Sequence, residues 1–185
     1  MIASPRLITR IALFSALAFV VAWACAAMPN VNLVFFVFFS AGYLWGALPG
    51  ALVGIIGMGL FTTLNPFGPA ALPVSLAQML GAAACGVTGA VFVRLLRPSL
   101  HQVARLVALA IAGAVCTCAF YLPVSAVDAW VFQPFWPRFI SGLAFSLISL
   151  VSNIVIFPLL FTITRHLYDR ERSRLWKNQP YSSVL

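Results

Sequence analysis

Long apolar segments separated by short polar or proline-containing stretches constrain this chain more than any other feature. Six such segments cover residues 8–28, 31–48, 50–64, 73–96, 103–127 and 139–164. An α-helix rises about 1.5 Å per residue, so about 20 apolar residues cross the roughly 30 Å hydrocarbon core of a bilayer. Only 8% of the chain is charged, against roughly a quarter in soluble proteins. The sequence therefore predicts an all-α integral membrane protein.

Basic residues at the ends of these segments predict an orientation. If the amino terminus is cytoplasmic, only Arg138 among the 11 Lys and Arg residues lies on the outer side. Positive charge favours the cytoplasmic side, so we expect six transmembrane helices with both termini in the cytoplasm. A retained first helix is favoured over a signal peptide, because further spans follow it. The basic residues expected inside are Arg6, Arg10, Arg94, Arg97, Arg105, Arg165, Arg170, Arg172, Arg174 and Lys177.

Two regions are expected along the chain. Residues 1–168 form the six-helix transmembrane domain that binds a substrate, and residues 169–185 form a basic, polar cytoplasmic tail. The net charge of +8 does not indicate nucleic-acid binding, because the sequence has no basic stripe with interleaved aromatic residues. The bilayer is the expected partner of the basic residues.

The stretch Leu64–Gln78 separates the third and fourth apolar segments. Pro66, Pro69 and Pro73 remove backbone donors there, and Gly68 adds freedom, so a continuous helix is excluded. In the expected orientation this turn shares the outer face with residues 28–32 and 128–138, which we expect to be loops. These three stretches carry much of the polar and tryptophan content that the spans lack.

Polar and aromatic residues of these loops predict a small-molecule site. Aromatic rings could stack on a flat heterocycle, amides could bind its polar edge, and a charged residue could meet a charge. A bundle of this size has room for a cavity of about 300–1,000 Å³. The candidate substrate-binding residues are Asn30, Asn32, Asn65, Gln78, Tyr121, Asp128, Trp130, Trp136 and Arg138, with Asn153 in the middle of the last span.

Several of these residues have a simpler explanation. Trp130 and Trp136 could belong to the aromatic belt found at membrane interfaces. Asp128 and Arg138 could pair with each other, and Asn65 could only cap its turn. Asn153 could bond a neighbouring helix rather than line a cavity.

Enzymatic chemistry has little material in this sequence. The chain has three carboxylates, of which only Asp128 lies outside the basic tail, and no metal-ligand or phosphate-loop motif occurs. We therefore expect no catalytic residue, no cofactor and no metal. Because the spans carry no acidic residue, an ion gradient has no evident coupling site, and energy for any transport must come from a partner.

Three sequence stretches resemble a known family. They are PNVNLVFFVFFSAGYLWG at 29–46, GALVGIIGMGLFTTLNPFGPA at 50–70 and LAQMLGAAACGVTGA at 76–90. Together with six spans in a chain of this length, they resemble the substrate-binding S components of energy-coupling factor (ECF) vitamin transporters. The resemblance covers roughly residues 10–153. It implies an S-component-like bundle in a bacterial or archaeal cytoplasmic membrane, with high affinity for a vitamin or cofactor precursor.

The resemblance also implies partners. S components associate with a membrane coupling subunit and two ATPases, and they dock through small residues on their first helix. Ala12, Ser15 and Ala16 match that spacing, although the same residues could instead pack inside the monomer. Two alternatives stay open, namely a solitary transporter or channel that works without ATPases, and a structural membrane subunit that binds no solute.

Overall fold

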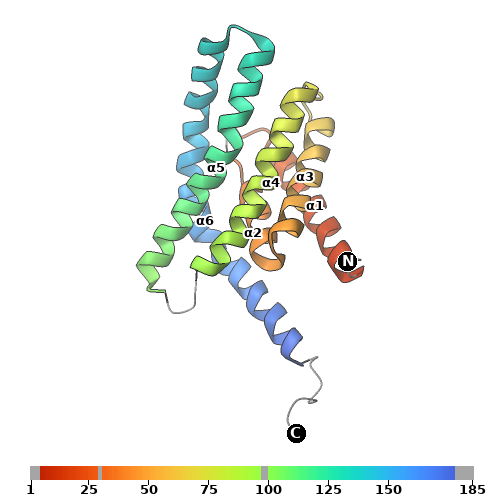
Figure 1. Cartoon of the computed structure of the whole chain (residues 1–185), viewed down its shortest axis with the longest axis vertical. Helices are drawn as coiled ribbons and strands as arrows, with labels where there is room; N and C mark the ends of the chain where they lie inside the picture. Colours follow the sequence, from red (N-terminus) through yellow and green to blue (C-terminus); the bar gives the residue numbers. More distant parts are fainter. Residues whose placement is uncertain (1–4, 29–30, 97–99, 178–185) are drawn as a thin grey trace.

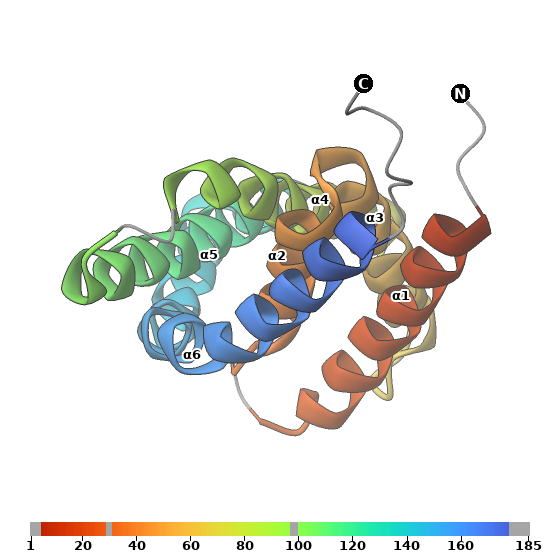
Figure 2. The same ribbon diagram turned by 90° about the horizontal axis from the view of Figure 1, so that it is seen from below.

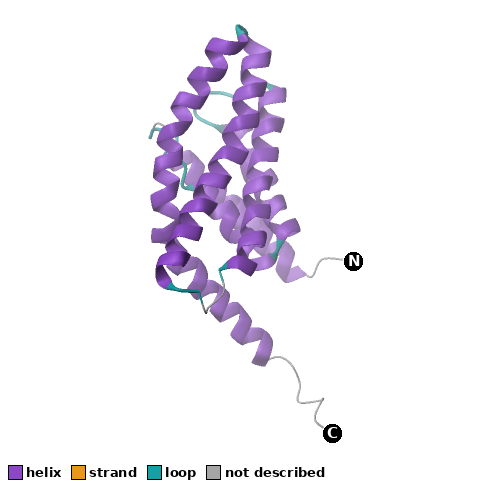
Figure 3. Cartoon of the chain, turned by 60° about the vertical axis from the view of Figure 1, so that its left-hand side comes forward, coloured by secondary structure: helices purple, strands orange, loops and turns teal. Residues whose placement is uncertain are grey.

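The computed structural model describes residues 5–28, 31–96 and 100–177, with side chains up to residue 173. Throughout these residues the regular secondary structure is helical, as Figure 3 shows. The helices are α1 (Pro5–Cys25), α2 (Val34–Trp45), α3 (Ala47–Leu64), α4 (Leu72–Leu95), α5 (Gln102–Phe132) and α6 (Phe135–Lys177). The prediction of an all-α protein is thus confirmed for this part of the chain.

Five of the six helices are long and apolar enough to cross a membrane; the exception is α2. The prediction of several apolar helices, which is the pattern of a multi-pass membrane protein, is confirmed. The expected second span at residues 31–48 is shortened, since α2 has 12 residues and a length of about 18 Å. It ends at Gly46, whose positive φ of 98° favours glycine, and α3 begins at the next residue.

The short helix α2 is the centre of the bundle. It packs against each of the other five helices, and Figure 2 shows it between α1, α3, α4 and α6. Its phenylalanines Phe35, Phe38 and Phe39 are completely buried. Because α2 is enclosed by protein, it can be shorter than a helix that contacts lipid.

Small residues let α2, α3 and α4 approach closely. A Cβ added at Gly86 of α4 would collide with the backbone of Gly50 on α3, and one added at Gly42 of α2 would collide with the backbone of Gly86. Close packing of glycines is a common way for helices to associate in membranes. It brings the backbones of these three helices into close contact in the interior of the bundle.

The helices alternate in direction, so their connections gather at two ends. The 65–71 and 133–134 connections lie toward the upper end of Figure 1, whereas α1 begins and α6 ends in its lower part. The carboxyl-terminal part of α6 extends beyond the bundle there. The arginines at helix ends on this side, which we call the basic end, include Arg6, Arg10, Arg94, Arg105 and Arg172. Arg97 lies outside the described residues, as do the side chains of Arg174 and Lys177.

The prediction of a loop at residues 128–138 is largely wrong. Helix α5 continues to Phe132 and α6 begins at Phe135, so the break between them is two residues long. Pro137 does not prevent this, because it lies in the first turn of α6, where no intrahelical donor is needed. The helix α6 also passes residue 168 without interruption and reaches Lys177, so secondary structure does not divide the chain at the expected start of the tail.

Candidate solute cavity

A cavity of about 350 Å³ lies at the end of α2 opposite the basic end. We call it the Asn32 cavity. The described residues that line it carry no formal charge. They come from α1 to α5 and from the connections between α1 and α2 and between α3 and α4. They are Ala22, Cys25, Ala26, Met28, Asn32, Val34, Met58, Phe61, Phe67, Gln78, Phe120, Tyr121 and Val124.

Two polar residues of the lining, Asn32 and Tyr121, belong to a hydrogen-bond network with Ser149. The Nδ2 atom of Asn32 donates to the hydroxyl of Tyr121 at 2.7 Å and to Oγ of Ser149 at 3.0 Å. The two hydroxyl oxygens lie 3.0 Å apart and bond each other. Asn32 is therefore held in place by α5 and α6, although its own backbone belongs to neither helix.

The backbone around Asn32 is not helical. In the described residues, both 26–28 and 31–33 lie outside the helices. In membrane proteins, non-helical backbone is tolerated where it lines a cavity or is buried in protein. The position of Asn32 before α2 is thus consistent with a built cavity wall.

Two amide residues of the lining, Asn32 and Gln78, have hydrogen-bonding groups without a partner in the described part of the chain. Within the described residues, Oδ1 of Asn32 accepts no hydrogen bond, and neither Oε1 nor Nε2 of Gln78 has a partner. Together they offer two acceptors and one donor. Such a set can bind the polar edge of an uncharged molecule.

Aromatic rings form the apolar part of the cavity. Phe120 and Tyr121 are adjacent on α5, with ring centroids 5.3 Å apart, and Phe35 of α2 packs on Phe120 at 4.7 Å. Phe67, on the turn between α3 and α4, contributes from the rim and is otherwise exposed. The site therefore combines aromatic surface with few polar groups, as ligand sites commonly do.

Asn65 shapes the turn that carries Phe67. Its Oδ1 accepts from the backbone N–H of Phe67 at 2.9 Å, and its Nδ2 donates to the carbonyl of Gly68 at 2.6 Å. Asn65 does not line the Asn32 cavity. Its capping role, one of the two interpretations open from the sequence, is the one that the contacts favour.

Four other candidates lie away from the cavity. Trp130 and Trp136 are each 68% exposed, which suits residues of an aromatic belt. Asp128 and Arg138 pair with each other at 3.1 Å across the α5–α6 connection. The contacts thus favour the simpler interpretations for all four.

Asn153 is fully buried, with 0% exposure, between α5 and α6. Its Nδ2 donates to Oγ1 of Thr117 at 3.1 Å, and its Oδ1 has no partner in the described part of the chain. It does not line the Asn32 cavity. The structure therefore brings together Asn32, Gln78 and Tyr121 of the candidate set, while Asn30 lies outside the described residues.

Sequence reasoning missed Ser149 and the apolar cavity residues. Ser149 precedes Asn153 by four positions, so both belong to one face of α6, and this spacing could have identified it. Phe61, Phe120 and Met58 gave no such signal, because apolar residues occur throughout the spans.

The expected docking residues on α1 divide into two groups. Ala12 and Ala16 are exposed, whereas Ser15 is 2% exposed. Ser15 and Ala18 face Gly57 of α3, where an added Cβ would lie 2.9 Å from that of Ala18. Internal packing therefore accounts for Ser15, and Ala12 and Ala16 remain on the outer face of α1.

Comparison of the chain with protein-family models, with curated proteins and with solved structures finds no match. Fold and cavity are consequently the basis for any functional conclusion.

Proposed function

We propose that this chain is a membrane-embedded, high-affinity substrate-binding subunit of an ECF-type importer for a vitamin or cofactor precursor. In this proposal the six helices cross a bacterial or archaeal cytoplasmic membrane and both termini are cytoplasmic. The observation that carries it is the Asn32 cavity, in which open amide groups and aromatic rings converge at the end opposite the basic end. A preformed cavity of this composition is the usual form of a small-molecule site.

The solute is uncharged, flat and small. The described lining has no charged side chain, and the two charged candidates, Asp128 and Arg138, pair with each other outside it. A volume of about 350 Å³ is at the lower end of ligand cavities. Asn32 and Gln78 would bind the polar edge of a heterocycle, with Phe120 and Tyr121 against its faces.

A partner powers the transport. Asp128 is an exposed ion-pair partner of Arg138, and the other two carboxylates, Asp169 and Glu171, lie in the last part of α6. Asp128 lies inside α5, four residues before the end of that helix, and not beyond the span as the sequence predicted. None of the three carboxylates lies in the middle of a helix, where a coupling acid is expected. The exposed Ala12 and Ala16 of α1 leave a shallow surface on which a helix of the coupling subunit could pack.

Mass spectrometry of small molecules that co-purify with the chain in mild detergent tests this proposal. The variant Gln78→Leu, which removes one of the two amides that line the cavity, should lose the co-purifying compound. Gln102→Leu makes the same chemical change at an exposed position of the basic end and should retain it. Equal retention by both variants would contradict the proposed site, and absence of any bound compound from the wild-type protein would favour a structural subunit.

A further inference from the structure

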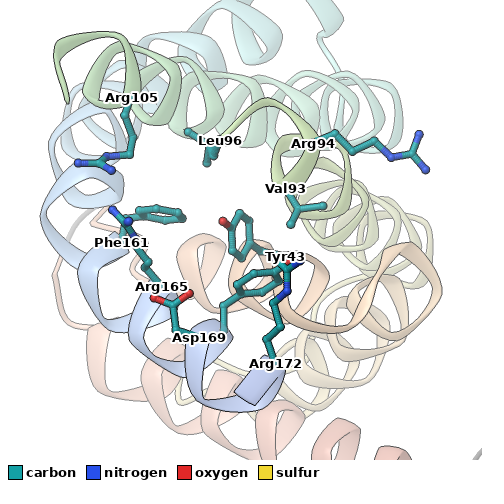
Figure 4. Close-up of a pocket in the computed structure, with 10 residues that line it drawn as sticks. Tyr43, Val93, Arg94, Leu96, Arg105, Phe161, Arg165, Asp169 and Arg172 are labelled. Atoms are coloured by element: carbon teal, nitrogen blue, oxygen red, sulfur yellow. The ribbon is translucent and has the colours of Figure 1, made fainter. Parts of the chain in front are cut away.

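A second cavity, of about 370 Å³, lies at the basic end of the bundle (Figure 4). We call it the arginine cavity. It is formed where α2 and α4 end, where α5 begins and along the carboxyl-terminal part of α6. Its polar lining includes Tyr43, Arg94, Arg105, Arg165, Tyr168 and Arg172.

One face of α6 forms a wall of this cavity. Phe161, Arg165, Tyr168 and Arg172 follow one another at intervals of three or four residues, which places them on one side of a helix. Arg105, in the first turn of α5, faces this wall, and Figure 4 shows its side chain and that of Arg165 extending from the two opposite helices. Arg94 points away from the cavity in the same view.

The positive charge of the cavity is largely uncompensated. Arg105, Arg165 and Arg172 line it together with the single carboxylate of Asp169, which leaves a formal charge of +2 without Arg94. Glu171, the other acid nearby, is bound by Arg10 at 2.6 Å. In the described part of the chain, Arg105 and Arg165 form no ion pair. Cationic groups gathered in a concave site raise the local concentration of anions.

Tyr43 adds a hydrogen-bonding group to the cavity wall. The residue is only 5% exposed, its ring is packed by Phe161 at 5.2 Å and Tyr168 at 5.3 Å, and its hydroxyl points toward the open centre in Figure 4. Among the described residues this hydroxyl has no hydrogen-bond partner. A buried ring that presents an unpaired hydroxyl to a positive cavity indicates a ligand with acceptor oxygens.

We propose that the arginine cavity binds a phosphate group. The planar guanidinium groups of Arg105 and Arg165 can each donate two parallel hydrogen bonds to phosphate oxygens, and the Tyr43 hydroxyl can donate a further one. The ligand is either the headgroup of an anionic phospholipid or a soluble phosphate compound. Basic cavities between transmembrane helices are suited to phospholipid headgroups. This proposal is independent of the solute that the Asn32 cavity binds.

Two measurements on the full-length chain distinguish the sources. In the first, the protein is placed in nanodiscs that contain equal amounts of phosphatidylglycerol and phosphatidylcholine. The protein is then released from the nanodiscs, and the lipid that stays bound to it is identified by native mass spectrometry. In the second, inorganic pyrophosphate is titrated into the delipidated protein in uncharged detergent. Retained phosphatidylglycerol identifies the lipid as the source, and saturable pyrophosphate binding identifies a soluble compound. Failure of both measurements would overturn the proposal.

A matched pair of double variants separates the cavity from the basic surface. Arg105→Gln/Arg165→Gln should lower binding of the retained probe about tenfold or more, since charge-assisted hydrogen bonds are lost. Arg6→Gln/Arg170→Gln removes the same charge from exposed positions of the same end and should change it less than about threefold. Equal losses in the two double variants would overturn a defined site.

Tyr43→Phe gives a milder test that keeps the ring and its packing. Loss of the hydroxyl should weaken binding of the same probe about threefold to tenfold, while the melting temperature stays close to that of the wild type. Unchanged binding in Tyr43→Phe would contradict the assigned contact.

Discussion

The two cavities have nearly equal volumes, about 350 Å³ and about 370 Å³, but opposite chemistry. The Asn32 cavity is uncharged and offers amides and aromatic rings, whereas the arginine cavity carries a formal charge of +2 from Arg105, Arg165, Arg172 and Asp169. Both lie at an end of α2, with Asn32 just before that helix and Tyr43 near its end. Because α2 has 12 residues and its neighbours have 18 or more, it stops inside the bundle at each end and leaves space there. One short central helix is thus flanked by two cavities, and the residues around each cavity determine its chemistry.

Disrupting the packing of α2, α3 and α4 should damage both cavities together. Gly86→Ala forces a Cβ into the backbone of Gly50, and we expect it to cost about 3 kcal/mol of stability. At Gly59 an added Cβ meets only the Met79 side chain, at 3.3 Å, so Gly59→Ala should cost less than about 1 kcal/mol. Melting temperatures in detergent measure the difference, and equal stability of the variants would contradict the central packing.

Asn32→Leu should affect one cavity only. The substitution removes the amide acceptor that we propose binds the solute, while the hydroxyls of Tyr121 and Ser149 still bond each other. We expect the dissociation constant of the co-purifying compound to rise about tenfold to 100-fold. Pyrophosphate or phosphatidylglycerol binding should not change. Parallel losses at both ends would show that the two cavities are not independent.

Salt should separate the two cavities without any substitution. Raising NaCl from about 0.05 M to about 0.5 M shortens the Debye length from more than 10 Å to a few ångströms. Binding at the arginine cavity should fall severalfold, whereas solute binding at the uncharged cavity should hold within about twofold. Isothermal titration calorimetry at both salt concentrations measures the two affinities. A strong salt dependence of solute binding would show that a charged group takes part in binding the solute.

The smallest effect is expected at the exposed pair of Asp128 and Arg138. Asp128→Asn breaks an ion pair whose side chains are 36% and 46% exposed, so less than about 1 kcal/mol of stability should be lost. Solute affinity should stay within about twofold, as measured by titration. A tenfold loss of affinity would show that Asp128 takes part in binding the solute.

Much of the fold could be predicted, because hydrophobic length limits how a membrane chain can be arranged. The ends of α2 at Gly46 and of α3 before Pro66 follow from local backbone chemistry. The helical course of residues 128–132 could not be read from composition, because aromatic residues and one acid suit a helix end as well as a loop. The short length of α2 could not be predicted either, since it depends on the enclosure of this helix by the five others.

The candidate site was predictable where a polar residue stands isolated among apolar ones or next to a helix break. Gln78 and Tyr121 are of the first kind and Asn32 is of the second, and all three line the cavity. Asn153 met the same criterion but bonds Thr117, because spacing along one helix does not reveal which neighbour a side chain meets. The arginine cavity could not be predicted from the sequence, because membrane orientation alone explains why arginines lie at the ends of the helices.

The central claim is that this chain binds a solute but cannot drive its import. The direct test is uptake of the co-purifying compound by proteoliposomes that contain only this chain, with a proton or sodium gradient imposed. We predict binding without accumulation, and accumulation only when the coupling subunit and ATPases are added together with ATP. Accumulation by the chain alone under either gradient would contradict the claim.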